Sequence, residues 1–195
     1  MRQPFASLAG VATLGLLATQ SASAHVLNDG GGLFAGLAHP FLGIDHVLAM
    51  LAVGLWAAQM GGRALWTVPL TFMAALAGGA CLAITGVALP GVEAGIAASV
   101  LAFGLLIAAA VRLPLVAGML LTGVFAVFHG HAHGAELPAI ASPLAYAGGF
   151  LVATGVLYLT GVAAARAFNP RRLRLAGVCV AAAGVAIVAG LLGSA

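Results

Sequence analysis

Six apolar segments separated by short breaks constrain the fold of this chain more than any other feature. Each segment has close to the ~20 residues that an α-helix needs to cross a bilayer. The breaks carry Gly and Pro, as in Gly61-Gly62 and Leu89-Pro90-Gly91, which are typical of helix ends. With 63% hydrophobic residues, 6% charged residues and a mean hydropathy of +1.18, the composition differs strongly from that of soluble proteins. We predict an all-α, polytopic membrane protein with six transmembrane helices, at residues 38–59, 65–87, 94–111, 113–134, 143–165 and 174–192.

The N-terminus has the three parts of a secretory signal peptide. Arg2 supplies a positive start, residues 8–18 form an apolar stretch too short to span a bilayer, and Ala22-Ser23-Ala24 resembles a cleavage site. We predict cleavage after Ala24, which leaves residues 25–195 as the six-helix domain and His25 as its first residue. An uncleaved first helix is the alternative.

The placement of arginine gives a separate prediction of orientation. The sequence has no Lys, and six of its seven Arg lie around the first, third and fifth breaks between segments. Positive residues are retained on the cytoplasmic side of a membrane, so these breaks are predicted to face the cytoplasm. This agrees with a signal peptide that leaves the N-terminus outside. We predict a multi-pass protein of the bacterial inner membrane with periplasmic N- and C-termini. The six residues are Arg63, Arg112, Arg166, Arg171, Arg172 and Arg174.

Several function classes find no support in the sequence. The net charge of +3 comes from Arg residues between apolar segments, so we expect no nucleic-acid partner. The Gly runs match neither GxxxxGK[ST] nor GxGxxG, and no HExxH motif occurs. Cys81 and Cys179 lie inside apolar segments without metal-ligand spacing, and we interpret them as small packing residues. We therefore predict no enzyme activity and no prosthetic group.

Two short stretches hold five of the six His and two of the four acidic residues. The first, HPFLGIDH at residues 39–46, opens the first predicted helix, and the second, FHGHAHGAE at residues 128–136, closes the fourth. An ionisable group at membrane depth costs roughly 2.5–3.5 kcal/mol on insertion scales, so such groups are rare and indicate function. The predicted topology places both stretches in the outer half of the membrane, where their side chains can meet.

Helical phase selects the side chains of the second stretch that share a face. At 3.6 residues per turn, His133 and Glu136 lie within ~40° of His129, whereas His131 lies ~200° away. If the helix is regular through Gly130, His131 therefore points away from the first stretch. We expect His129, His133 and Glu136 to face it.

The first stretch is harder to place by phase. His39 and His46 are seven residues apart and nearly eclipsed on a regular helix, and Asp45 lies ~120° from their line. Pro40 suits the first helical position, which places His39 near the cap. All three polar side chains remain candidates for one site.

Imidazole nitrogens with carboxylate oxygens suit Ni, Co, Zn, Cu or non-haem Fe, and a carboxylate offsets the charge of a dication. A single membrane His is more often a packing residue, but five His and two acids in one leaflet disfavour that interpretation. A non-transporting metal sensor or accessory protein is one alternative, and a b-type haem protein with two axial His is another. The predicted metal ligands are His39, Asp45, His46, His133 and Glu136, with His129 either a further ligand or a residue that supports one.

Three further residues are weaker candidates. Glu93 opens the third predicted helix on the outer side, where a solvated acid at a helix end is as reasonable as a role in the site. Phe72 is interpretable as a packing or interfacial aromatic. His25 offers an α-amine and an imidazole on one residue, a chelating pair on the outer face if cleavage follows Ala24.

The two polar stretches resemble the HPxxGxDH and FHGxAHGxE signatures of the HupE/UreJ family. The signal peptide, six helices and outside N-terminus match as well, so the resemblance covers the whole chain. It implies a permease that carries Ni²⁺, or Co²⁺ in some relatives, from periplasm to cytoplasm for hydrogenase or urease maturation. Metal-delivery proteins of those pathways would be its partners. The family's functional positions fall on these six residues of the predicted metal site and, more weakly, on Glu93 and Phe72, whereas His131 occupies a variable position.

Overall fold

The computed structural model describes residues 32–137 and 142–193, and every regular element in these ranges is a helix. The predicted all-α class is therefore confirmed. The predicted signal peptide and His25 lie outside the described residues. The elements in chain order are α1 (Gly32–Ala38), the 3₁₀ turn η2 (His39–Phe41), α2 (Ile44–Met60), α3 (Ala64–Ile84), α4 (Val92–Ala108), α5 (Leu115–Ala135), α6 (Pro143–Ala167) and α7 (Pro170–Gly193).

The first predicted helix, 38–59, is wrong as a continuous element. The chain forms α1 and η2, and the axis then turns by 80° before α2 begins. Pro40 lies within η2, where its missing N–H and its ring disfavour continuation of the preceding helix. Gly43 follows with an extended backbone (φ −106°, ψ 118°) and precedes α2. His39 therefore lies on the turn, whereas His46 lies in the first turn of α2.

The last helix begins earlier than predicted, at Pro170 instead of residue 174. Proline is favoured at the first helical position because its fixed φ suits the helix. The backbone N–H of Arg172 donates to the side-chain oxygen of Asn169 at 2.9 Å, which caps the helix start. Three of the arginines predicted between helices thus lie in the first turns of α7. The boundaries of α3 to α6 agree with the prediction within one turn.

Four described helices, α3, α5, α6 and α7, are long and apolar enough to cross a membrane, and a fifth span results if α1, η2 and α2 form one broken span. Helix α4 is apolar but has only 17 residues. Length and composition therefore identify four or five spans in the described ranges, in keeping with a multi-pass membrane protein. They do not establish the predicted six.

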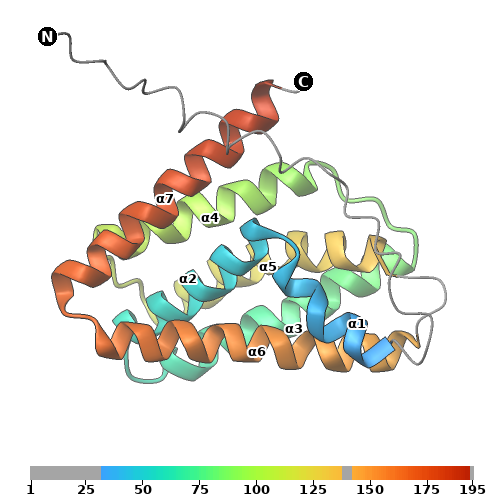
Figure 1. Cartoon of the computed structure of the whole chain (residues 1–195), viewed down its shortest axis with the longest axis horizontal. Coiled ribbons are helices and arrows are strands. Elements are labelled where there is room, and N and C mark those ends of the chain that lie inside the picture. Colours follow the sequence, from blue (N-terminus) through green and yellow to red (C-terminus); the bar gives the residue numbers. More distant parts are fainter. Residues whose placement is uncertain (1–31, 138–141, 194–195) are drawn as a thin grey trace, which may run out of the picture.

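Helix α2 occupies the centre of the bundle and packs against α3, α4 and α6. Its side chains Met50, Val53 and Trp56 are fully buried. Figure 1 shows the connections α2–α3, α4–α5 and α6–α7 together at one end, on the left. We call this the arginine end, because it carries the six arginines named above. The opposite end, where α2 begins and α5 ends, is the histidine end.

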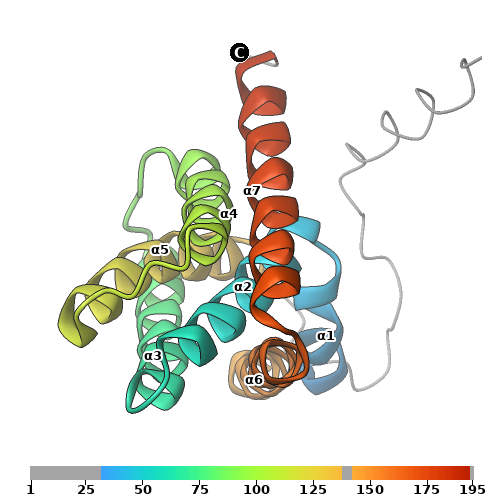
Figure 2. The ribbon, with the colours of Figure 1, turned by 90° about the vertical axis from the view of Figure 1, so that its left-hand side faces the viewer.

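Glycines allow two helix pairs, α3/α5 and α4/α7, to pack backbone against backbone; Figure 2 shows α4 beside α7. A Cβ on Gly177 of α7 would collide with the backbone nitrogen of Ala108 in α4. Small residues allow membrane helices to approach this closely. A Cβ on Gly130 of α5 would likewise collide with the carbonyl oxygen of Leu76 in α3. This contact seats α5 on α3 next to His129 and so fixes the direction of that side chain.

Candidate metal site

Four histidine rings form an unbroken series at the histidine end. The ring centroids are 4.8 Å apart for His39 and His133, 4.2 Å for His133 and His46, and 4.8 Å for His46 and His129. His39 comes from η2, His46 from α2, and the other two from α5. All except the partly exposed His39 are buried. The two polar stretches therefore meet as predicted, although His39 reaches the cluster from a turn instead of from a helix shared with His46.

The outer part of the cluster has a carboxylate. One ligand atom from each of His39, His133 and Glu136 lies within 4.8 Å of the others, and His39 Nε2 is 3.1 Å from Glu136 Oε2. Glu136 caps the C-terminus of α5 and is exposed. The hydrogen bond with His39 lowers the pKa of Glu136 below its ordinary value and outweighs burial, which raises it. The carboxylate is therefore ionised at neutral pH and offers a negative charge at the mouth of the cluster.

A second carboxylate orients the ring of His46. Asp45 Oδ1 accepts hydrogen bonds at 2.8 Å from both the backbone N–H and Nδ1 of His46. A ring that donates through Nδ1 carries its lone pair on Nε2. That atom is buried and has no hydrogen-bond partner among the described residues. Metal-binding histidines commonly show this pattern, in which a carboxylate holds one nitrogen and the other faces the ion.

Ser99 of α4 orients the ring of His129 in the same way. Its hydroxyl donates to the carbonyl oxygen of Ile96 at 2.6 Å, and a hydroxyl has only one proton. At 2.8 Å from His129 Nε2 it must therefore accept from that nitrogen. The lone pair of His129 lies on Nδ1, which is buried without a partner in the described ranges. Sequence reasoning missed Ser99, because a lone Ser in an apolar helix looks like a small packing residue.

The cluster presents four buried ring nitrogens without hydrogen-bond partners among the described residues: His46 Nε2, His129 Nδ1 and both nitrogens of His133. Each unpaired buried polar atom costs about 1–3 kcal/mol. Because no described residue pairs with these four nitrogens, hydrogen bonding within the protein does not explain why they are buried together. Convergent imidazole nitrogens with nearby carboxylates fit Ni²⁺, Co²⁺, Zn²⁺ or Cu²⁺. The donor set therefore fits a transition-metal dication.

Aromatic rings surround the histidines. The buried Phe72 of α3 lies with its ring centroid 5.5 Å from that of His129, at the position that the family resemblance implied. Phe150 of α6 lies 4.2 Å from His133, centroid to centroid. Tyr146, one turn earlier on α6, is 5.6 Å from His39 by the same measure. Phe150 and Tyr146 were not predicted, because their role depends on the face that α6 turns to the bundle.

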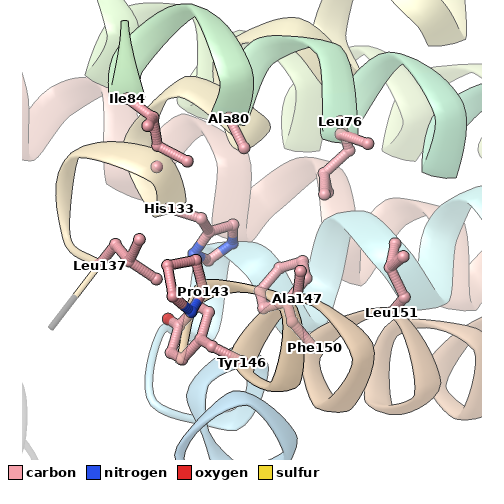
Figure 3. Close-up of a pocket in the computed structure, with 12 residues that line it drawn as sticks. Leu76, Ala80, Ile84, His133, Leu137, Pro143, Tyr146, Ala147, Phe150 and Leu151 are labelled. Carbon is pink, nitrogen blue, oxygen red and sulfur yellow. The ribbon is translucent and has the colours of Figure 1, made fainter. Parts of the chain in front are cut away.

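A cavity of about 70 Å³ reaches His133 from between α3 and α6 (Figure 3). Leu76 and Ile84 line it from α3, and Tyr146 and Phe150 line it from α6. Apart from His133 and Tyr146, the lining is apolar. Such walls do not compensate the lost hydration of an ion, so this side is unsuited to the entry of a cation. The exposed Glu136 marks the more favourable approach.

Three residues from the sequence analysis are not part of the cluster. Glu93 is exposed in the first turn of α4 and does not join the histidines in the described structure. His131 donates from Nε2 to the carbonyl oxygen of Val87 at 2.9 Å, so it points away from the site, in agreement with helical phase. His25 lies outside the described residues.

Comparisons with known proteins agree with the two motifs. The model of the family described as HupE / UreJ protein matches residues 12–187. The protein named Protein HupE from Rhizobium leguminosarum bv. viciae is 45% identical over 183 residues, which cover 91% of this chain and 96% of that protein. No solved structure matches the chain significantly. The resemblance predicted from the polar stretches is thus confirmed, and the chain belongs to the HupE/UreJ family.

Proposed function

We propose that this chain is a permease that carries a transition-metal dication, with Ni²⁺ favoured over Co²⁺, from periplasm to cytoplasm for hydrogenase or urease maturation. Members of the family are associated with nickel or cobalt uptake for these enzymes. The observation that carries the proposal is the set of four buried, unpartnered imidazole nitrogens at the histidine end. A hydrogen-bonded packing cluster would have paired these atoms with other protein groups.

The proposal gives the residues of the cluster different roles. His39, His133 and Glu136 would capture the ion at the outer end, because one donor atom from each lies within a 4.8 Å span. His46 and His129 would hold it one step deeper. Asp45 would act mainly by orienting His46 and by offsetting the charge of the ion, since its Oδ1 accepts two hydrogen bonds from that residue.

The proposed topology has six crossings, with the histidine end in the periplasm and the arginine end in the cytoplasm. Helix α4 would be a sixth span, because its 17 residues fall at the lower limit of the ~17–25 that can cross. The positive-inside rule and the signal peptide support this orientation. A reporter fused after Ala195 tests it, since a signal from the cytoplasm would contradict a periplasmic C-terminus.

The geometry argues against a haem protein. Two axial imidazoles would need to lie on opposite faces of a porphyrin. Here neighbouring histidine rings lie 4.2–4.8 Å apart by their centroids, in direct contact, which leaves no space for the macrocycle between them. A metal-binding accessory protein that does not transport remains the competing class, and uptake measurements separate it from a permease.

Cells that lack their own nickel transporters and express this chain are expected to accumulate radiolabelled Ni²⁺ from a nickel-poor medium. The same cells with an empty vector give the background. Excess unlabelled Co²⁺ should reduce the uptake if the site also accepts cobalt, whereas Mg²⁺ should not, because imidazole suits the transition metals. Uptake equal to the empty-vector background, with the protein present in the membrane, would contradict the permease proposal.

A further inference from the structure

Buried hydroxyl groups continue from the histidine cluster towards the arginine end. The side-chain oxygens of Thr122 on α5, and of Thr154 and Tyr158 on α6, are buried without a hydrogen-bond partner among the described residues. Thr122 and Thr154 are 0% exposed and Tyr158 is 2% exposed. Threonine hydroxyls in helices often bond to the carbonyl four residues earlier, as exposed Thr160 does to Val156 at 2.8 Å. The two buried threonines do not, so their hydroxyls are free for another partner.

Helix α6 connects these hydroxyls to the cluster. Tyr146, Phe150, Thr154 and Tyr158 follow at four-residue steps, so each side chain lies next to the one before it on the helix surface. Phe150 contacts His133 with a centroid distance of 4.2 Å. At the helical rise, Thr154 and Tyr158 lie ~6 Å and ~12 Å beyond Phe150 towards the arginine end. Beyond the residues that touch the cluster, α6 thus carries two hydroxyls that are unpartnered among the described residues.

On α5, a third hydroxyl that is unpartnered in the described ranges also lies towards the arginine end. Thr122 precedes His129 by two helical turns on the same face, so it lies ~10 Å closer to the arginine end. The ring of Phe72 is 5.5 Å from that of His129 and 5.5 Å from that of Tyr158, centroid to centroid. A single aromatic ring therefore links the inner limit of the histidine cluster to the region of the hydroxyls.

We propose that Thr122, Thr154 and Tyr158 form an inner binding step for a hydrated transition-metal dication that leaves the histidine cluster. This inference rests on the proposed transport function and extends it. Hydroxyl oxygens are neutral and bind Ni²⁺ less strongly than imidazole, but they can hydrogen-bond to its water ligands. Conduction requires sites weak enough to release the ion, and a step of lower affinity after the imidazoles meets that need.

Packing alone does not explain the three hydroxyls. Val has nearly the shape of Thr, and Phe has nearly the shape of Tyr. An apolar side chain of the same shape avoids the cost of burying an unpaired hydroxyl. A purely structural role therefore predicts that Thr122→Val, Thr154→Val and Tyr158→Phe leave uptake unchanged and leave the protein equally or more stable. The inner-step proposal predicts loss of uptake in the same stable proteins.

The test uses two measurements. The first is the initial rate of radiolabelled Ni²⁺ uptake by cells that express each variant. The second is Ni²⁺ binding to the purified full-length protein, measured by titration calorimetry. Each single variant is expected to lose uptake about tenfold, as for one lost hydrogen bond at the rate-limiting step, and the triple variant more. In these variants, the affinity for Ni²⁺ and the thermal unfolding temperature should remain at or above the wild-type values. The matched control is Thr160→Val, which removes an exposed hydroxyl from the same helix and should change neither quantity.

The outcomes separate the two proposals. Wild-type uptake in the single and triple variants would overturn the inner step and leave the permease intact. Parallel loss of binding and uptake would also overturn it, since the hydroxyls would then belong to the outer site or to the fold. Absence of uptake by the wild-type chain itself would remove the transport on which the inference depends. Loss of uptake with retained binding is the result that supports it.

Discussion

Replacing His133 by Ala is expected to abolish nickel uptake, whereas replacing His131 by Ala should leave most of it. Both ring nitrogens of His133 are buried within the cluster without hydrogen-bond partners among the described residues. His131, only two positions away, donates to the carbonyl oxygen of Val87 between α3 and α4. Changes to residues that only support a ligand lower metal affinity or activity ~10–100-fold, so loss of a ligand itself should lower uptake by more than that. Initial uptake rates at limiting Ni²⁺ measure the contrast.

The pair of variants controls for simple counting of histidines. Each removes one imidazole from the same turn of α5, so the two variants have the same composition. Immunoblots of the membrane fraction verify equal insertion. If both variants lost uptake to the same extent, the segment around Gly130 would not act as the regular helix that the structure shows, and the assignment of His133 as a ligand would fail.

Neutralising either carboxylate is the second change with a large expected effect. Asp45→Asn and Glu136→Gln keep the shape of the side chain and remove one negative charge from a site that must hold a dication. Asp45→Asn also weakens the hydrogen bond that presents His46 Nε2 to the cluster. We expect each variant to lose uptake at least ~10–100-fold while the protein still inserts.

The two carboxylates should differ in how they respond to metal concentration. Glu136 lies exposed at the mouth of the cluster, so Glu136→Gln should raise the Ni²⁺ concentration needed for half-maximal uptake. Asp45 contacts a buried ligand, so Asp45→Asn should lower the maximal rate at saturating Ni²⁺ as well. Wild-type transport by both variants over the whole concentration range would contradict the proposed site.

The convergence of the two polar stretches was predictable from the sequence, because it depends only on helix direction. An inward helix that begins with HPFLGIDH and an outward helix that ends with FHGHAHGAE place both at the same side of a membrane. Helical phase then separated His131 from His129 and His133, and the structure agrees. It failed for His39, because Pro40 and Gly43 interrupt the segment and set that residue on a turn.

The polar residues on single apolar helices were not predictable in this way. In a soluble protein, an apolar stripe shows which face of a helix is buried, but a membrane helix is apolar towards lipid and towards its neighbours alike. The sequence therefore cannot distinguish Ser99, which bonds His129, from a threonine such as Thr160 at the outside of α6. The distinction depends on which helices pack together, and α4 meets α7 through glycines that carry no chemical signal of the site.

The central claim is that imidazoles from α2 and α5 bind the transported ion. Nickel K-edge X-ray absorption on the purified, Ni²⁺-loaded protein tests this claim most directly. We expect a shell of nitrogen and oxygen atoms near 2 Å, as is typical of imidazole and carboxylate ligation, with the multiple-scattering pattern of at least two imidazoles. That pattern should weaken in the variant that combines His46→Ala with His133→Ala. An oxygen-only shell in the wild type, or an unchanged imidazole pattern in the double variant, would contradict the account.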